Sequence, residues 1–226
     1  MPTAILTRRE PVGGALHRVV LEVAPDAARA HVHHGQYVEV RPRERDAKGL
    51  FVLASSPGSR AYELVVKPGG AMADRLLSMR EGTELWVSEP LGRGFPLEAS
   101  RHRPLLLAAT GSGLAAVLSC LRARAADGDG ARTYLVYGVR ERRDVALEPE
   151  LSAARAAGIE VAVCLSREHS DEPGFFRGYV QHVAMRHGWA LADGKVFAAG
   201  SAAMLEGMRE LAPSLGLTAA DVFINS

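Results

Sequence analysis

The spacing of apolar residues changes once along this chain, near residue 100, and this change restricts the fold more than any other feature of the sequence. Before residue 100, apolar and polar residues tend to alternate, as in Val19, Leu21 and Val23 and again in Leu85 and Val87. Alternation is typical of antiparallel strands that bury one face. Glycine and proline interrupt the pattern at EPVGG, HHGQ, SSPGS and KPGG. We therefore predict an antiparallel Greek-key β-barrel of about six strands over residues 1–98.

After the connector FPLEASRHRP, the pattern consists of continuous apolar runs separated by helical segments. The runs are PLLLAAT, TYLVYG, IEVAVCLS, KVFAAG and VFINS. Continuous apolar strands that alternate with helices are typical of a parallel sheet covered on both faces. We therefore predict a second domain over residues 103–226, an α/β domain with a parallel five-stranded sheet, and hence a two-domain chain.

The charge balance limits the partners that this chain is expected to bind. Its 226 residues include 27 Lys and Arg against 26 Asp and Glu, so no excess of positive charge would attract nucleic acid or an anionic membrane. The N-terminal sequence MPTAILTRREPVGG lacks the apolar core of a signal peptide, and no apolar run reaches the roughly 18 residues of a membrane span. We expect a cytoplasmic protein that binds neither nucleic acid nor a membrane.

The cysteines and histidines do not indicate a metal site. Cys120 and Cys164 are too few for a disulfide framework or a four-cysteine iron–sulfur cluster, and both fall in apolar segments, so we interpret them as core thiols. The segment HVHH supplies His31, His33 and His34 without an accompanying cysteine or carboxylate. We interpret it as the polar edge of a strand and predict no metal.

The stretch TGSGLAA lies where the first apolar run of the second half gives way to a helical segment. At such a junction, unpaired backbone N–H groups and the helix dipole favour an anion, and glycine lets a phosphate approach the backbone. Glycines also simply permit a tight turn, and the third glycine of the usual dinucleotide fingerprint is missing. The turn by itself leaves both interpretations open.

The order of these parts resembles the ferredoxin–NADP reductase superfamily, in which a flavin-binding barrel precedes a pyridine-nucleotide domain. The family's nucleotide turn reads Gly-Thr/Ser-Gly-Ile-Ala-Pro and stands here as GSGLAA. The segment PLGRGFPL, at 90–97, is similar to the glycine-rich end of the barrel in dihydroorotate dehydrogenase electron-transfer subunits. The segments YGVRERRDV and AAGSAAM are similar to two further family turns and follow in the expected order. The resemblance covers nearly the whole chain.

The resemblance implies that the barrel binds FAD, although two family motifs are altered. The family's Arg-x-Tyr-Ser stands here as GLFV, so Gly49 replaces the arginine that would bind the diphosphate, and Val52 replaces the serine. Phe51 keeps an aromatic plane for the flavin. The second motif, Gly-x-x-Ser/Thr, stands as GAMA without its hydroxyl. The residues that the resemblance assigns to the flavin are Phe51, Leu53, Ala54, Ser55, Ser56, Lys67, Gly70, Ala71 and Met72.

The resemblance also implies a site for NADP, or NAD, in the second domain. The segment LSREHSDEPGFFRGYVQ is similar to the NADP-selecting segment of plant-type reductases, in which cationic and hydroxyl groups bind the 2′-phosphate and an aromatic ring covers the adenine. The family's cysteine near the hydride-transfer site aligns with Ala199. The residues assigned to the nucleotide are Thr110, Gly111, Gly113, Gly138, Arg140, Ser166, Arg167, Arg177, Tyr179, Gln181, Gly200, Ser201 and Met204.

The function that this resemblance implies is that of an FAD-dependent oxidoreductase. It would transfer a hydride or electrons between NAD(P)H and an acceptor that the sequence does not identify, such as an electron-acceptor protein or a partner subunit. No general acid or base is apparent, so the catalytic residues are unknown. The alternative is a non-catalytic binding or sensor module with a degenerate flavin site, which the altered flavin motifs favour.

Overall fold

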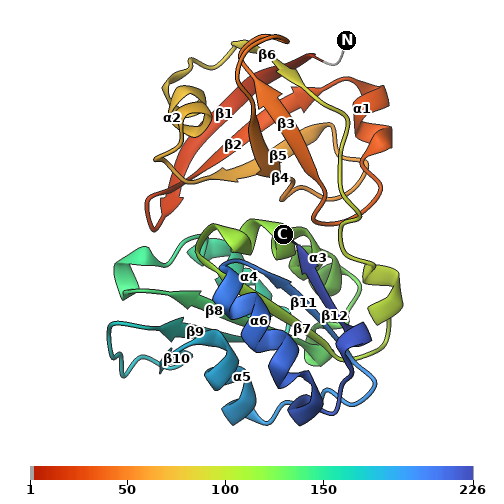
Figure 1. Cartoon of the computed structure of the whole chain (residues 1–226), viewed down its shortest axis with the longest axis vertical. Helices are drawn as coiled ribbons and strands as arrows, with labels where there is room; N and C mark the ends of the chain where they lie inside the picture. Colours follow the sequence, from red (N-terminus) through yellow and green to blue (C-terminus); the bar gives the residue numbers. More distant parts are fainter. Residues whose placement is uncertain (1–2, 226) are drawn as a thin grey trace.

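The first half of the chain is a six-stranded antiparallel barrel in the order β4-β3-β6-β1-β2-β5. A computed structural model describes residues 3–225 (Figure 1). The barrel closes where Leu53, just after β4, pairs with Leu64 of β5. Its elements are β1 (Thr3–Gly13), β2 (Leu16–Val23), α1 (Pro25–Ala30), β3 (Tyr37–Arg41), β4 (Gly49–Val52), β5 (Ala61–Val66), α2 (Ala71–Ser78) and β6 (Glu84–Val87). The predicted Greek-key barrel is confirmed.

The interior of the barrel is formed by the alternating apolar residues of its strands. Leu21, Leu64 and Leu85 are buried, and Leu76 of α2 packs into the same cluster. Alternation places every second side chain inside, so a short strand contributes two or three core residues.

The histidine-rich segment is not the polar strand edge that we predicted. His31 follows α1, is 1% exposed, and meets the Tyr62 ring edge-on with 5.8 Å between ring centroids. The sequence interpretation was wrong because α1 was not foreseen, and the end of this helix directs His31 into the barrel. Within residues 3–225, no group of three His, Cys, Asp or Glu side chains is arranged to hold a metal ion.

The second half of the chain is a parallel sheet in the order β10-β9-β8-β7-β11-β12. Five of its strands are the predicted ones, and the sixth is the three-residue β10, which pairs with β9 at the sheet edge. The strands are β7 (Leu105–Thr110), β8 (Thr133–Val139), β9 (Glu160–Leu165), β10 (Phe175–Arg177), β11 (Lys195–Ala199) and β12 (Val222–Asn225).

Helices cover both faces of this sheet, as the continuous apolar runs predict. Leu105 and Leu107 pack with the residues of α3 and α4, whereas Leu106 and Ala108 pack with those of α5 and α6. The helices are α3 (Leu114–Ala126), α4 (Glu148–Ala156), α5 (Val180–His187) and α6 (Ala202–Leu211). Short 3-10 helices lie at Leu97–Ser100, Gly111–Gly113, Gly130–Arg132, Arg142–Asp144, Ala212–Leu215 and Ala219–Asp221. No helix described in residues 3–225 is both long and apolar enough to cross a membrane.

The two domains pack directly against each other. The core on the α3 side of the sheet continues into the barrel, and Phe95 stacks on Phe197 with 4.8 Å between ring centroids. β12 ends beside the barrel (Figure 1), where the Asn225 side chain donates a hydrogen bond to the carbonyl oxygen of Gly35 at 2.6 Å. The carboxyl end of the sheet therefore lies close to the barrel.

A buried arginine ties the connector between the domains to the second domain. Arg124 of α3 is 2% exposed, and its guanidinium donates to Thr133 Oγ1 at 2.8 Å and to Asp129 Oδ2 at 2.9 Å. It also donates to the carbonyl oxygens of Ser100 and Arg103, both at 2.8 Å. These contacts compensate the burial of the charge and hold the connector against the start of β8.

Candidate functional site

The candidate nucleotide site lies where the direction of the chain through the parallel sheet reverses. From β7 the chain moves outward through β8, β9 and β10, whereas β11 lies on the other side of β7 and leads to β12. In open parallel sheets, ligands bind beyond the carboxyl ends of the strands at such a reversal. Thr110 ends β7, and Gly200 directly follows β11.

The two glycines of the turn after β7 have different roles. Gly111 has a φ of +54°, and a Cβ added there would meet no atom within 4 Å. A Cβ on Gly113 would instead collide with the carbonyl oxygen of Ala199 at the end of β11. Gly111 thus leaves room for a ligand, whereas Gly113 is required by the close approach of the two strand ends.

The turn after β11 is fastened to the turn after β7. The backbone N–H of Ser201 donates to Thr110 Oγ1 at 2.9 Å, and Ser201 Oγ caps α6 by accepting from the backbone N–H of Met204 at 3.4 Å. The N-terminal ends of α3 and α6 therefore meet at the reversal of the sheet. Helix N-termini carry unpaired N–H groups and a partial positive charge, which favour a phosphate.

Three arginines follow the neighbouring strands at the same end of the sheet. Arg140 follows β8, Arg167 follows β9, and Arg177 ends β10. The backbone N–H of Arg167 donates to the carbonyl oxygen of Arg140 at 2.9 Å, and that of Ser166 donates to Val139 at 3.1 Å, so these turns lie side by side. Among residues 3–225, none of the three arginines forms an ion pair within 4.0 Å.

The remaining predicted nucleotide residues divide into exposed and buried ones. Tyr179 precedes α5 and is 59% exposed, so its ring is accessible to an adenine. Gln181 packs against α6, because a Cβ on Gly207 would lie 3.2 Å from its Cγ. Gly138 and Met204 are buried beneath the site, so they are not accessible to a ligand.

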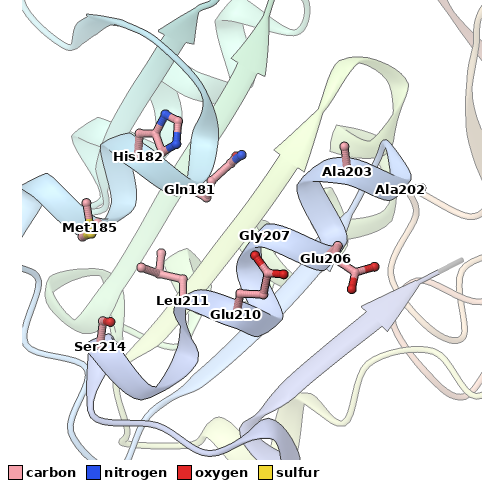
Figure 2. Close-up of a pocket in the computed structure, with 10 residues that line it drawn as sticks. All are labelled: Gln181, His182, Met185, Ala202, Ala203, Glu206, Gly207, Glu210, Leu211 and Ser214. Atoms are coloured by element: carbon pink, nitrogen blue, oxygen red, sulfur yellow. The ribbon is translucent and has the colours of Figure 1, made fainter.

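A groove of about 600 Å³ runs between α5 and α6, next to this site (Figure 2). Gln181, which is predicted to contact the nucleotide, lines this groove, and the groove extends along α6 past Ala203. Figure 2 shows that α6 also contributes Glu206 and Glu210 to its lining. Two carboxylates oppose a phosphate, so the arginine-lined end of the sheet suits the nucleotide better than this groove does.

The segment predicted to contact the flavin is largely buried. Leu53 and Ala54 are fully buried, and Ser55 is 5% exposed. The hydroxyl of Ser55 accepts a hydrogen bond from the backbone N–H of Glu63 at 3.2 Å. Ser56 is the exposed hydroxyl of this segment.

The space beside Gly49 is filled by two neighbouring side chains. A Cβ on Gly49 would lie 2.6 Å from Cε2 of Phe51 and 2.8 Å from Cγ of Met72. Met72 is itself buried. An arginine at this position, as in the family motif, would require both side chains to move.

The N-terminus of α2 already has a carboxylate beside it. Asp74 Oδ1 accepts a hydrogen bond from the backbone N–H of Gly69 at 2.7 Å, and in the described part of the chain no side chain caps the helix at Gly70. Lys67 and Ala71 are exposed nearby. Asp74 was not among the predicted site residues, although a carboxylate directly after the GAMA motif was a visible signal. The negative charge of Asp74 would repel the phosphates of an FAD bound at this helix N-terminus.

The residues present therefore fit the two cofactors unequally. Open space at Gly111, two helix N-termini and three arginines that form no ion pair within residues 3–225 fit a nicotinamide dinucleotide. On the barrel, backbone N–H groups and Lys67 remain for the diphosphate of FAD, but the arginine and the hydroxyl are missing and Asp74 lies close by. The fit to FAD is partial.

An antiparallel barrel followed by a parallel α/β domain, with a glycine turn at the reversal of the sheet, is the two-domain fold of the ferredoxin-reductase-like proteins. Residues 107–210 match the family model described as oxidoreductase NAD-binding domain. The chain belongs to the ferredoxin–NADP reductase-like family of oxidoreductases. The predicted family membership is confirmed.

Two curated relatives and one solved structure illustrate the similarity. The ferredoxin–NAD(+) reductase component of the alkene monooxygenase system of Xanthobacter autotrophicus is 32% identical over 165 residues, which is 72% of this chain and 49% of that protein. Ferredoxin–NADP reductase B of Sorangium cellulosum is 34% identical over 141 residues, 60% of this chain and 57% of that protein. The cytochrome P450 reductase of Amycolatopsis superposes with a TM-score of 0.84 and 23% identity, over 99% of this chain and 68% of that one. The chain spans about half the length of the curated relatives it matches.

Proposed function

We propose that this chain is an NAD(P)H-dependent oxidoreductase that passes reducing equivalents, by way of a flavin on the barrel, to a separate acceptor protein. The observation that carries the proposal is the glycine turn at the reversal of the sheet, where Gly111 leaves open space beside the N-terminus of α3. A bound FAD would supply the ability to accept a hydride and to release electrons singly or in pairs. Two relatives that are named as ferredoxin reductases support the same class of activity.

The protein's own residues would act by binding and positioning. The backbone N–H groups after Gly111 and Ser201 would hold the diphosphate of the nucleotide, and the connected turns of Thr110 and Gly200 would keep these groups in place. On the barrel, Phe51 and Ser56 would contact the flavin ring, and Lys67 with the start of α2 would contact its phosphates. No side chain is assigned as a proton donor or acceptor.

We further propose that NADP is bound in preference to NAD. Arg167 and Arg177 follow adjacent strands, form no ion pair within residues 3–225, and lie at the end of the sheet where the adenosine would bind. A 2′-phosphate pairs well with guanidinium groups, and the exposed ring of Tyr179 offers a face to the adenine. The relatives include both an NAD and an NADP reductase, so direct measurement decides.

The test is to record the visible spectrum of the purified protein and to titrate it with FAD, NADPH and NADH. We expect NADPH to bind, FAD to raise the melting temperature by mass action, and the protein with added FAD to oxidise NADPH in the presence of an artificial electron acceptor. Absence of a flavin spectrum, of a melting shift and of NADPH oxidation at high FAD would refute the oxidoreductase function.

A second candidate function is a nucleotide-binding module without flavin chemistry. The observations that favour it are the carboxylate of Asp74 at the start of α2 and the filled space beside Gly49. This module would bind NADPH with a normal affinity but would neither bind FAD nor oxidise NADPH. The same titrations therefore separate the two functions.

A further inference from the structure

A network of charged side chains crosses the boundary between the two domains. Arg18 of β2 lies 2.9 Å from Glu10 and 2.8 Å from Glu63 of the barrel, and it also contacts Glu150 of α4. Arg122 of α3 forms a bidentate pair with Glu63, with N–O distances of 2.6 and 3.1 Å, and lies 3.5 Å from Glu150. Glu63 is therefore shared between an arginine of its own domain and one of the other domain.

This network is partly shielded from water. The side chains of Glu63 and Glu150 are 14% and 16% exposed, and that of Arg122 is 35% exposed. Loss of one partner from a shielded pair leaves a charge without compensation, whereas exposed pairs contribute little. The pair of Arg60 and Glu22, which lies within the barrel, is an exposed pair, with side chains 59% and 53% exposed.

The network ends on the segment that is predicted to contact the flavin. Arg122 Nη1 donates to the carbonyl oxygen of Ala54 at 3.3 Å. The backbone N–H of Ala54 donates to the carbonyl oxygen of Glu63 at 2.8 Å, and the backbone N–H of Glu63 donates to Ser55 Oγ at 3.2 Å. Arg122 and Glu63 together hold residues 54 and 55 in place.

The helix that carries Arg122 also begins at the nucleotide turn. α3 starts at Leu114, directly after Gly111–Gly113, and Arg122 lies about two helical turns further along. A helix of 13 residues with a buried face is a rigid element. A single element thus connects the turn assigned to the nucleotide with the barrel segment that is predicted to contact the flavin.

We infer that Arg122 is a positioning residue, which fixes residues 53–56 relative to the glycine turn and thereby sets the separation between the nicotinamide and the flavin. This inference rests on the proposed function. A misplacement of about 1 Å between two reacting groups can lower a rate by about 100-fold. All the residues assigned to NADPH lie in the second domain, so the affinity for NADPH is not expected to change. Arg122 would therefore affect the rate of hydride transfer and not nucleotide binding.

The test compares three variants of the full chain: Arg122→Met, Arg122→Lys and the control Arg60→Met. For each, kcat for NADPH oxidation is measured at saturating FAD with an artificial acceptor, together with the Kd for NADPH and the melting temperature. We expect Arg122→Met to lower kcat by about tenfold or more and to leave Kd within about twofold. Arg122→Lys should recover part of the loss, because it restores the charge but not the bidentate geometry. Arg60→Met should leave kcat unchanged.

A second variant, Glu63→Gln, tests the same contact from the barrel side and replaces Arg122→Met if the latter does not fold. It should lower kcat in the same way with Kd unchanged. If the parent protein oxidises NADPH and both variants keep its kcat, or if the conservative lysine gives no recovery, the positioning role is overturned while the proposed function stands. If the parent itself shows no NADPH oxidation with FAD, the proposed function fails, and the positioning role fails with it.

Discussion

The two candidate ligand sites of this chain are built on the same kind of element, a helix N-terminus that follows a glycine-containing turn, yet they differ in what surrounds that element. At α3, Gly111 leaves open space, and arginines lie on the neighbouring strand ends. At α2, Asp74 binds a backbone N–H of the turn, and Met72 fills the space beside Gly49. A helix N-terminus is therefore better suited to an anion where the space around it is open and no carboxylate of the chain lies beside it.

The largest effect that we expect concerns the response of the two domains to acid. Burial lowers the pKa of His31 and of His34 from 6.5 to about 4, and both lie in the barrel. The unfolded chain takes up protons near pH 6.5, whereas the folded barrel resists protonation until about pH 4. The stability that neutral His31 contributes is present above pH 6.5, is lost as the pH falls towards 4, and amounts to about 3 kcal/mol.

Single-tryptophan variants can assign this acid effect to a domain, because Trp86 lies in the barrel and Trp189 in the second domain. Denaturant unfolding at pH 7 and pH 4.5, followed by fluorescence, should show that the barrel loses more stability than the second domain. His31→Gln should reduce the pH dependence, and His169→Gln, at an exposed position, should not. Equal losses in the two domains would contradict the prediction.

The next effect concerns nucleotide choice at the open site. Arg167→Ala should weaken NADPH binding by roughly ten- to a hundredfold, since a charge-assisted hydrogen bond contributes about 1.5–3 kcal/mol. NADH, which lacks the 2′-phosphate, should bind as before. Arg155→Ala, which removes an arginine of α4, is the matched control. Equal losses for both nucleotides, or a parent that prefers NADH, would show that Arg167 has no part in selecting NADP.

A smaller effect is expected from closing the open space at the nucleotide turn. Gly111→Ala should weaken NADPH and NADH alike by about tenfold, because its Cβ would project into the space that we assign to the diphosphate. Gly128→Ala is the matched control, since Gly128 also has a positive φ, of +73°, and open space around it. Gly113 is unsuitable for this test, because a side chain there would displace the end of β11 itself. If Gly111→Ala binds as tightly as the control, the turn is structural only.

The smallest effect that we expect is on the affinity of the barrel for FAD. Asp74→Asn removes the negative charge beside α2 and should tighten FAD binding by about two- to fivefold, as expected for a charge near a helix terminus. Riboflavin has no phosphate, so its binding should not change. Asp26→Asn on the surface of α1 is the control. An unchanged affinity for FAD would mean that Asp74 does not oppose the flavin diphosphate.

The sequence predicted the strands well and the site in part, for identifiable reasons. Apolar periodicity located the barrel and the predicted parallel strands, but β10 has only two apolar residues, Phe175 and Phe176, in a polar segment and gave no periodic signal. The glycine turn was visible between an apolar run and a helical segment, whereas its assignment to the nucleotide, like that of the arginines, came from the resemblance. The contact between Arg122 and Glu63 joins residues 59 positions apart on separate domains, and no local pattern reports such a pair. The packing of Met72 over Gly49 likewise depends on how α2 lies against β4.

The hydrogen bonds between Arg124 and the connector determine where this protein could be divided. Because Arg124 binds the carbonyl oxygens of Ser100 and Arg103, the connector belongs mechanically to the second domain and would not serve as a hinge. A chimera that joins a foreign barrel to this nucleotide domain at residue 104 would keep Thr133 and Asp129 but would replace the connector residues whose carbonyl oxygens bind the buried guanidinium. A junction before residue 97 would keep Ser100 and Arg103. We therefore expect grafts made before residue 97 to fold and grafts made after Arg103 to aggregate.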